Sequence, residues 1–464
     1  MLELRPYQTD SVTELREAYA NGAKSPLYVL PTGGGKTFSF AYIAMLTANR
    51  GGRVLILVHR SELIKQSSAT LDFIGVPHGI VAPGHSATDD AVQIASVQTL
   101  ARRIKKRAYH ADLIIVDEAH HAVAGSWRKI LDAFPEARIL GVTATPCRLD
   151  GRGLDGVFDA MIQGPSVSDL IEAGYLSEYS LFAPSCDLDM SRVTRRGGDY
   201  AKNEIAEQVD KPTITGSAVG HYRRLCDGRP AIAFCATVKH AEHVAETFRI
   251  AGYNSESLDG TLDAETRAAR IAGLASGEIH VLTSCEIISE GFDLPAVAVA
   301  ILLRPTASTS LYLQQVGRAL RPFPGKSKAV ILDHVGNTLR HGLPDEDREW
   351  SLDGLAKRSR GATEAGPSFI QCARCFFCFV PEPRCPHCGA ECALPKDRTP
   401  DEVEGELVEL SAEEIAAARA ARKREEGRAG TLEELLALAK QRGYKPGWAH
   451  YRWTARQKRM GAMR

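Results

Sequence analysis

Over its first 335 residues the chain alternates short apolar segments with amphipathic stretches. The apolar segments of the first part occupy residues 27–30, 54–58, 92–96, 113–116 and 139–142. They are mainly apolar rather than alternating in polarity, as expected of parallel strands buried on both faces of a sheet. Helical spacing fills the gaps between them, for example at residues 61–74. Residues 1–170 therefore predict one α/β domain with a parallel sheet.

A second series of the same kind follows a connector at residues 171–212. Its expected strands lie at residues 231–234, 255–258, 281–283, 297–302 and 329–332, and its expected helices at 238–251, 264–276 and 310–320. Residues 213–340 therefore predict a second domain. The predicted fold class is α/β, with two tandem parallel-sheet domains.

The chain changes character after residue 340. Residues 341–368 are polar and of mixed charge, as in a linker, and residues 369–394 contain six of the eleven cysteines. Residues 395–464 begin with an acidic stretch and end in a segment that combines cations with aromatic rings. We expect a small cysteine-rich module, an acidic linker, a helix and a basic aromatic tail. The tail suits contacts with phosphates and bases, although a docked basic tail has the same composition.

Composition narrows the class of protein. Apolar residues make up 44% of the 464 and charged residues 25%, as in an ordinary globular protein. The formal net charge is zero, so any surface for nucleic acid must be local. No apolar run reaches the roughly 18 residues that a membrane span needs, and no apolar signal segment opens the chain. We expect a cytoplasmic protein with reduced cysteines.

The first candidate for chemistry is a glycine-rich loop at residues 31–37, Pro-Thr-Gly-Gly-Gly-Lys-Thr. It lies between a predicted strand and a predicted helix, the context in which backbone N–H groups bind a phosphate. Lys36 would reach the β- and γ-phosphates and the Thr37 hydroxyl would hold Mg²⁺. Leu30 stands where the general phosphate-loop pattern has a glycine. Taken alone, the stretch leaves open an ordinary glycine-rich loop.

The second candidate is a pair of carboxylates at the end of an apolar strand, where residues 117–120 read Asp-Glu-Ala-His. Ligands of open α/β sheets bind at the carboxyl ends of strands. Asp117 is placed to hold Mg²⁺ and Glu118 to orient or deprotonate an attacking water, as phosphoryl transfer requires. A helix cap after a buried strand is the alternative.

With these two motifs the chain resembles the superfamily 2 helicases, whose cores are two RecA-like domains. Residues 5–8, Arg-Pro-Tyr-Gln, resemble the family's adenine-recognising segment, and the amide of Gln8 suits adenine. Segments 58–63 and 96–99 resemble strand-binding motifs, and 143–146 resembles the segment that couples ATP to nucleic acid. The resemblance implies nucleic-acid or coupling roles for Arg60, Ser96, Thr99, His120, Thr143 and Thr145.

The second domain completes the set of motifs. Residues 290–293, Glu-Gly-Phe-Asp, follow the strand that ends at Thr283 and resemble the motif that touches both ribose and nucleic acid. Residues 314–321 match the family pattern Gln-x-x-Gly-Arg-x-x-Arg. The resemblance implies nucleic-acid or coupling roles for Thr283 and Gln314. Arg318 and Arg321 are three apart, so we expect them on one helix face. Across a cleft they would neutralise charge on the γ-phosphate, an effect of about 10³–10⁵ in rate where such fingers occur. A solvated basic face is the alternative.

The resemblance therefore predicts an ATP site between the two domains that only domain closure completes. Lys36, Asp117, Glu118, Arg318 and Arg321 are its expected catalytic residues. The residues expected to contact ATP are Gln8, Thr32, Gly33, Gly34, Gly35, Lys36, Thr37, Gly291 and Asp293.

Within the superfamily the chain is similar to the RadD-like bacterial helicases over residues 3–335. Segments 146–149 and 300–312 and the later cysteine cluster support this likeness. It implies a motor on DNA, favoured over RNA, that acts in repair or recombination, with possible protein partners from those pathways. An RNA helicase remains an alternative. So does a zinc-ribbon recruitment protein in which ATP sets the conformation. The sequence leaves the oligomeric state open.

The cysteine cluster predicts a structural zinc site. Cys372 and Cys375 form one Cys-x-x-Cys pair and Cys385 and Cys388 another, which supplies four thiolates for tetrahedral Zn²⁺. Two further cysteines, at positions 378 and 392, leave the ligand set ambiguous.

Overall fold

The computed structural model describes most of the first 354 residues and parts of the remainder. The described residues are 3–106, 108–148, 150–183, 190, 193–210, 212–285, 297–354, 370–372, 378–379, 382–384, 389–392, 424–426, 428–442, 448–449 and 452–453.

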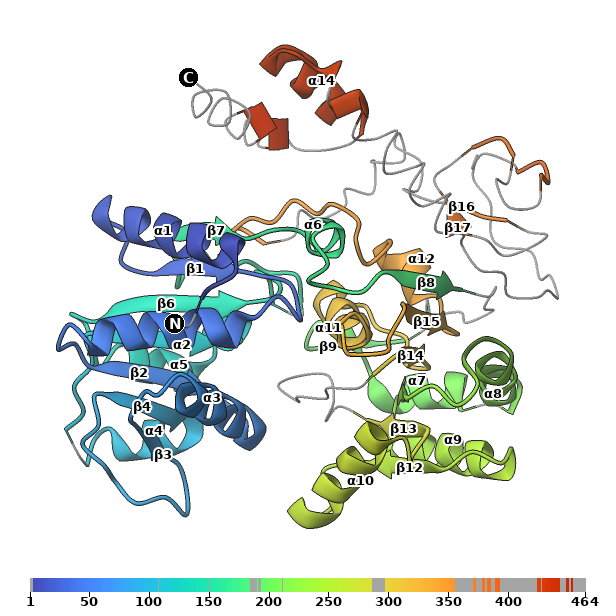
Figure 1. Cartoon of the computed structure of the whole chain (residues 1–464), viewed down its shortest axis with the longest axis horizontal. Coiled ribbons are helices and arrows are strands. Elements are labelled where there is room, and N and C mark those ends of the chain that lie inside the picture. The colour runs from blue at the N-terminus through green and yellow to red at the C-terminus, as the bar shows by residue number, and fades with distance from the viewer. Residues whose placement is uncertain are drawn as a thin grey trace. The chain divides into compact units, whose positions relative to one another are not determined.

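The first lobe is a parallel seven-stranded sheet in the order β3-β4-β2-β5-β6-β1-β7 (Figure 1). Its strands are β1 (Pro26–Val29), β2 (Val54–Val58), β3 (His78–Val81), β4 (Val92–Ser96), β5 (Leu113–Asp117), β6 (Arg138–Thr143) and β7 (Ala160–Gln163). Its helices are α1 (Pro6–Ala20), α2 (Lys36–Ala48), α3 (Ser61–Phe73), α4 (Val97–Arg103) and α5 (Gly125–Leu131).

Each central strand of this lobe is buried on both faces. Tyr28 and Leu30 pack with residues of α1, α2 and α3 in one core cluster. Their neighbours Leu27 and Val29 pack with residues of α4 and α5 in the other. Successive strand residues point to opposite faces, so a sheet with helices on both sides needs continuous apolar runs. The prediction of parallel strands buried on both faces of the sheet is therefore confirmed.

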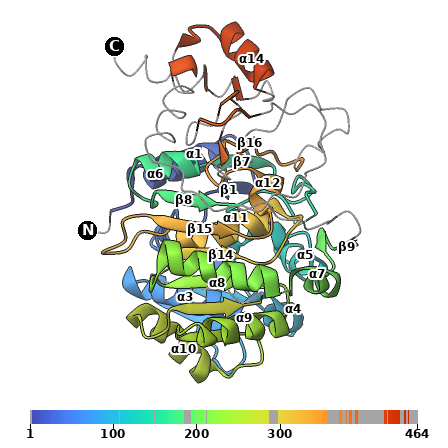
Figure 2. The ribbon, with the colours of Figure 1, turned by 90° about the vertical axis from the view of Figure 1, so that its right-hand side faces the viewer.

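The second lobe is a six-stranded sheet in the order β12-β13-β11-β14-β15-β8. Its strands are β8 (Tyr179–Phe182), β11 (Ala231–Phe234), β12 (Ser255–Leu258), β13 (Val281–Ser284), β14 (Val299–Leu302) and β15 (Ala329–Asp333). Its helices are α8 (Pro212–Cys226), α9 (Val238–Ile250), α10 (Ala264–Ser276), α11 (Thr309–Ala319) and α12 (Asn337–His341). Helices α8 and α9 lie side by side against the sheet (Figure 2). Two parallel-sheet domains in tandem confirm the predicted fold class.

Smaller elements connect and extend the lobes. They are η1 (Ala119–His121), α6 (Val167–Glu172), β9 (Arg195–Arg196), β10 (Asp199–Tyr200), α7 (Lys202–Val209), β16 (Ile370–Gln371), β17 (Cys378–Phe379) and α14 (Leu432–Gln441). Among the described residues, no helix has the length and apolar content that a membrane crossing requires.

Contacts divide the chain into two compact units. The first comprises Met1–Tyr179, Leu188–Glu346 and Trp350–Leu355, and the second Ser180–Asp187, Asp347–Glu349 and Ala356–Arg464. The first unit holds the phosphate loop, the Asp-Glu-Ala-His segment and α11. The second has a small apolar cluster of its own, in which Leu435 and Ala439 of α14 pack with Trp448 and Trp453.

Candidate functional site

The glycine-rich loop forms the start of α2, as predicted. Gly33 and Gly35 have φ values of 88° and 86°, a region that favours glycine. Gly35 is the N-cap of α2 and supplies no side-chain hydrogen bond to the first turn. The N–H groups at the start of a helix need acceptors, so this helix start suits a phosphate.

Close packing explains the glycines and the unusual Leu30. A Cβ on Gly34 would lie 2.8 Å from Cγ of Leu30, and one on Gly35 would lie 2.7 Å from Nε2 of Gln8. Leu30 is fully buried in the core beneath the loop. The Leu30 side chain therefore packs between the loop and the core, at a position where the general phosphate-loop pattern has a glycine.

The start of α1 holds the loop from the other side. Gln8 Nε2 donates to the Gly35 carbonyl at 3.2 Å, and its Oε1 accepts from Arg5 N at 3.0 Å. Tyr7 OH donates to the Gly34 carbonyl at 2.7 Å. Gln8 was predicted to recognise adenine; in this structure its amide joins α1 to the phosphate loop. Tyr7 and the Arg5 guanidinium also contact the ring of Tyr175.

Three charged side chains of the first lobe lie close to one another at the loop, namely Lys36, Asp117 and Glu118. Lys36 Nζ donates to the Leu30 carbonyl at 3.1 Å. Burial lowers the pKa of Lys36, and the carboxylates of Glu118 and Asp117 oppose this effect. Burial and the neighbouring Glu118 raise the pKa of Asp117. A buried carboxyl of raised pKa gains from a cation, because a cation restores its ionised form.

These residues fit a magnesium nucleotide. The fit rests on the uncapped helix start, the desolvated Lys36 and the buried Asp117. Thr37 and Asp117 are the residues that would hold the ion, and Thr37 Oγ1 at present accepts a 3.4 Å hydrogen bond from Gln66 on α3.

Polar side chains run from Glu118 to the second lobe. Glu118 Oε2 lies 3.4 Å from His120 Nδ1, which lies 3.4 Å from Thr143 Oγ1. Thr143 Oγ1 donates to the Thr145 carbonyl at 2.9 Å. The Thr145 hydroxyl in turn bonds that of Ser310 on α11.

The backbone is strained at Glu118, the first residue of this series. Glu118 has φ 51°, and among the described residues it alone has a positive φ without being glycine. Such a conformation costs roughly 1–3 kcal/mol and persists where surrounding structure imposes it. Here the Glu118 N–H donates to Asp117 Oδ1 at 3.0 Å. The turn therefore directs two adjacent carboxylates toward the phosphate loop.

One face of α11 meets the first lobe. Ser310 contacts Thr145, and a Cβ on Gly317 would lie 2.7 Å from Cβ of Thr32. Gln314 lies between Ser310 and Gly317 on this face, at helical spacing. It is 3% exposed, and its amide atoms make no hydrogen bond to any residue in the described part of the chain. A buried amide without partners suits a ligand in the cleft.

The two arginines reach the loop, but not from one helix face. Arg318 is buried on α11, whereas the helix ends at Ala319 and Arg321 lies beyond its cap. Pro322 is the reason, because a proline disfavours helical backbone in the residue before it. The expected shared helix face is therefore wrong. Arg321 Cγ nevertheless lies 3.4 Å from the Cβ position of Gly33, and both guanidiniums help to lower the pKa of Lys36.

The predicted strand-binding segments of the first lobe lie together. Gln98 Nε2 donates to the His59 carbonyl at 3.2 Å and joins the segments that contain Arg60, Ser96 and Thr99. In the second lobe, Thr283 is fully buried and donates to the Ala241 carbonyl at 2.8 Å. Its hydroxyl therefore supports α9 in this structure.

Several predicted ligands lie outside the described residues. They are Gly291, Asp293, Cys375, Cys385 and Cys388. Cys372 is described and buried. No metal-binding group of three or more His, Cys, Asp or Glu occurs among the residues that are described, so the zinc site stays a prediction.

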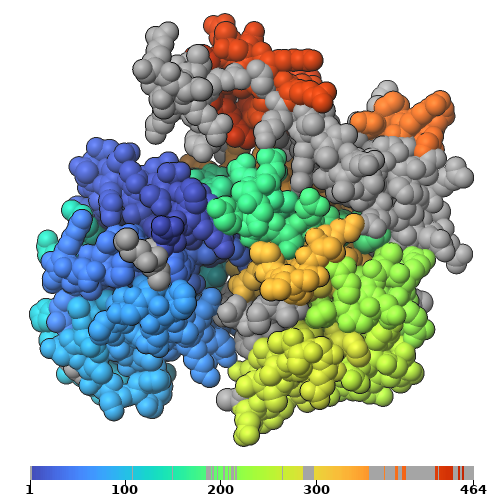
Figure 3. Space-filling view, viewed as in Figure 1, coloured from blue at the N-terminus to red at the C-terminus, as the bar shows by residue number. Residues whose placement is uncertain are grey.

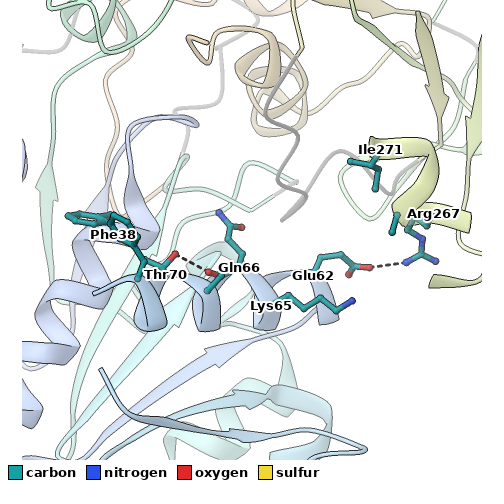
Figure 4. A pocket seen from close by; sticks show the side chains of 10 residues that line it. Phe38, Glu62, Lys65, Gln66, Thr70, Arg267 and Ile271 are labelled. Carbon is teal, nitrogen blue, oxygen red and sulfur yellow. Dashed lines mark hydrogen bonds and ion pairs between the residues drawn. The ribbon is translucent and has the colours of Figure 1, made fainter. Parts of the chain in front are cut away.

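Sequence reasoning missed an ion pair that joins the lobes. Arg267 Nη1 on α10 lies 2.9 Å from Glu62 Oε1 on α3, and both side chains are largely buried. The pair borders an open cleft of about 540 Å³, which Phe38, Gln66 and Phe73 also line (Figure 4). The two lobes face each other across it in the space-filling view, in blue and yellow-green (Figure 3). Glu62 stood in a recognised motif, but nothing in the sequence identified Arg267 as its partner.

A buried carboxylate in the connector was also missed. Asp199 pairs with Arg304 at 2.8 Å and accepts hydrogen bonds from the Thr306 hydroxyl and Ala307 N–H. These contacts fix the β9–β10 hairpin to the loop between β14 and α11. The sequence predicted only a connector at residues 171–212, without this hairpin or its anchor.

Charge reversal at Glu62 alone should weaken nucleic-acid-stimulated ATPase activity, because it breaks the pair with Arg267. A partly exposed ion pair contributes about 1 kcal/mol or less, so we expect Glu62→Arg to lower the rate by about fivefold. The double variant Glu62→Arg/Arg267→Glu should restore it. Asp89→Arg, which breaks the exposed pair with Arg53 inside the first lobe, is the control. A double variant no better than the single one would contradict a role for this pair in closure.

Comparisons with known proteins agree with this geometry. Residues 1–148 match the family described as "Type III restriction enzyme, res subunit", and residues 219–322 match "Helicase conserved C-terminal domain". A 51.5 kDa protein of a Lactococcus phage (isolate 7-9) is 32% identical over 83% of this chain and 82% of its own length. A Saccharomyces cerevisiae protein whose name proposes an ATP-dependent helicase, IRC3, is 32% identical over 72% of this chain.

The likeness extends to solved structures. A fragment of a proposed HsdR subunit of a type I restriction enzyme from Vibrio vulnificus has a TM-score of 0.59 at 22% identity, over 74% of this chain and 66% of that one. At this identity the likeness shows a shared fold. The chain spans about half of the yeast protein, 51%.

Proposed function

Because the chain belongs to the superfamily 2 helicases, we propose that it is a DNA helicase or translocase that acts in repair or recombination. The activity of the family is ATP hydrolysis that depends on nucleic acid. The observation that carries the proposal is the contact of α11 with the phosphate loop, where Gly317 meets Thr32 and Arg321 meets Gly33. This contact brings the arginines of one lobe to the lysine of the other.

The residues divide the work of hydrolysis as follows. The start of α2 and Lys36 would bind the phosphates, and Thr37 and Asp117 would hold Mg²⁺, which neutralises charge on the transferred phosphoryl group when bound. Glu118 would orient or deprotonate the attacking water. Arg318 and Arg321 would stabilise the charge that develops in the transition state. Since the arginines come from the second lobe, hydrolysis depends on closure.

The series of polar contacts from Glu118 to Ser310 supports coupling between hydrolysis and lobe movement. His120, Thr143 and Thr145 link the catalytic carboxylate to α11. Separation of the lobes would break the Thr145–Ser310 contact and change the environment of Thr143. DNA would lie across both lobes and be held mainly through its backbone, with little sequence preference.

A zinc ribbon in the C-terminal region is part of the proposal. Strands β16 and β17 pair with Gln371 opposite Cys378 and flank the segment that contains Cys372 and Cys375. A bridge between Arg384 and Glu391 flanks the second cysteine pair. Paired strands around a Cys-x-x-Cys are typical of zinc knuckles, in which four thiolates form a closed structural site.

The proposal is tested by ATPase rates with single-stranded, duplex and branched DNA and matched RNA, with zinc measured on the same sample. We expect DNA to raise the rate by at least about tenfold over the rate without nucleic acid, and by more than RNA of equal length. About one zinc ion per chain should be found. Stronger stimulation by RNA would identify an RNA helicase, and a zinc-free, fully active protein would contradict the ribbon.

A further inference from the structure

Arg321 lies beyond the end of α11. The helix ends at Ala319, with Leu320 as its cap, and Pro322 follows Arg321. The carbonyls at and after the end of a helix receive no N–H from the helix itself. The Arg321 side chain nevertheless packs against the phosphate loop at Gly33.

The ammonium of Lys326 binds the Arg321 carbonyl. Lys326 Nζ donates to the Arg321 carbonyl at 2.7 Å, to the Val297 carbonyl at 3.2 Å and to the Ala319 carbonyl. An ammonium has three hydrogens, so each has an acceptor. One cation thus joins the end of α11, the backbone of Arg321 and the segment that enters β14.

A second contact completes the arrangement. The Ser177 N–H donates to the Leu320 carbonyl at 2.7 Å. The three successive carbonyls of residues 319, 320 and 321 are therefore all held, two by Lys326 and one by Ser177. The last carbonyls of a helix ordinarily lack partners, and cations are favourable there.

The sequence between the two residues returns Lys326 to the helix end. Residues 322–325 read Pro-Phe-Pro-Gly, and Gly325 adopts φ 83°. Lys326 N donates to the Phe323 carbonyl at 3.1 Å, and its ammonium lies 5.4 Å from the Phe323 ring. The prolines limit the backbone of this turn, so the position of Lys326 relative to Arg321 is narrowly set.

Burial disfavours the charged form of the Lys326 ammonium. Desolvation, with a smaller effect from the Arg229 guanidinium, lowers the pKa of Lys326 to about 7. The three carbonyl acceptors favour the charged form, which alone can donate three hydrogen bonds. A methylene chain without a charge would fill the space, but it would leave three carbonyls without a donor.

We propose that Lys326 is a positioning residue for ATP hydrolysis, whose ammonium fixes the backbone of Arg321 so that the guanidinium lies against the phosphate loop. The inference rests on the proposed function, because it assigns Arg321 to the transition state. The acceptors of its ammonium are the carbonyls of Val297, Ala319 and Arg321, so Lys326 acts on the site through Arg321.

The test measures kcat, the KM for ATP and the melting temperature of Lys326→Met in the full chain with saturating single-stranded DNA. We expect kcat to fall by about 10- to 100-fold, since small displacements of a catalytic group have effects of this size. The KM for ATP should change by less than about threefold, because Lys36 and Thr37 are untouched. Lys326→Arg keeps the charge and should retain more activity. A kcat within about twofold of the parent for Lys326→Met would overturn the proposal.

A double variant separates positioning from stability. If Lys326 acts only through Arg321, Arg321→Ala/Lys326→Met should hydrolyse ATP no more slowly than Arg321→Ala alone. A further drop of about tenfold in the double variant would overturn the inference. Full activity of Arg321→Ala itself would instead show that the proposed role of the arginine is wrong.

Lys129 offers a matched control. Its Nζ donates to the Ala101 carbonyl at 2.7 Å, near the end of α4 in the first lobe. Lys129→Met therefore removes a lysine-to-helix contact that is remote from the arginines. It should lower the melting temperature to a similar degree while kcat stays within about twofold. An equal loss of kcat in both variants would show that Lys326 has only a structural role.

Discussion

Lys36→Ala should abolish ATP hydrolysis, with a fall of at least about 10²–10³-fold in kcat, the effect of removing one preorganised donor to developing charge. The ammonium lies at the start of α2, bonded to the Leu30 carbonyl and desolvated. A desolvated cation close to a loop of backbone N–H groups interacts with phosphate far more strongly than one in water. Alanine leaves the turn intact, since Gly33, Gly34 and Gly35 make it.

The measurement is the ATPase rate with and without single-stranded DNA, with ATP affinity measured separately. Lys24→Ala serves as the control, because that side chain is exposed ahead of β1 in the same lobe. Substantial DNA-stimulated hydrolysis by Lys36→Ala would contradict the assignment of this loop as the phosphate-binding site. Loss of stability is a separate matter, and the melting temperature of both variants checks it.

The sequence predicted the centre of each sheet better than its edges. Strands β2, β4 and β11 lie inside their sheets and have the predicted bounds, because inner parallel strands carry mainly apolar runs. The edge strand β12, with the sequence Ser-Glu-Ser-Leu, was also predicted with its correct bounds. Strands β3 and β7 escaped prediction. Both are edge strands of four residues, with two fully buried positions in β3 and one in β7. Their sequences therefore carry little continuous apolar signal.

The parts of the ATP site in the first lobe could be predicted from local motifs. The contacts that complete the site across the two lobes could not. The loop and the two carboxylates could be read from the chain because strand, turn and helix fix their geometry within a few residues. What joins the lobes depends on pairs far apart in the sequence, such as Glu62 with Arg267 and Thr145 with Ser310. No local pattern encodes such pairs. The wrong prediction that Arg318 and Arg321 share a helix face has another cause. Their spacing of three residues fits a helix, but Pro322 ends the helix before Arg321.

Glu118→Gln should bind ATP and fail to hydrolyse it, with a fall in kcat of about 10²–10⁴-fold, as expected when a general base is lost. Glutamine keeps the shape of the side chain, but it cannot accept a proton. It also keeps the Cβ, so the strained backbone at φ 51° is unchanged. Glycine would relieve that strain and confuse the result. The KM for ATP should stay within about threefold, because Lys36 and Thr37 do the binding.

This variant also decides between a motor and a switch. A motor needs each cycle of hydrolysis to reopen the lobes, so Glu118→Gln should hold DNA tightly with ATP and should neither translocate nor unwind. The measurements are DNA affinity with and without ATP, and strand displacement from a forked duplex. Glu136→Gln, an exposed carboxylate of the same lobe, is the control and should behave as the parent. If Glu118→Gln supported full biological activity, ATP binding alone would be sufficient, and the protein would act as an ATP-set binding module in which hydrolysis serves only to reset it.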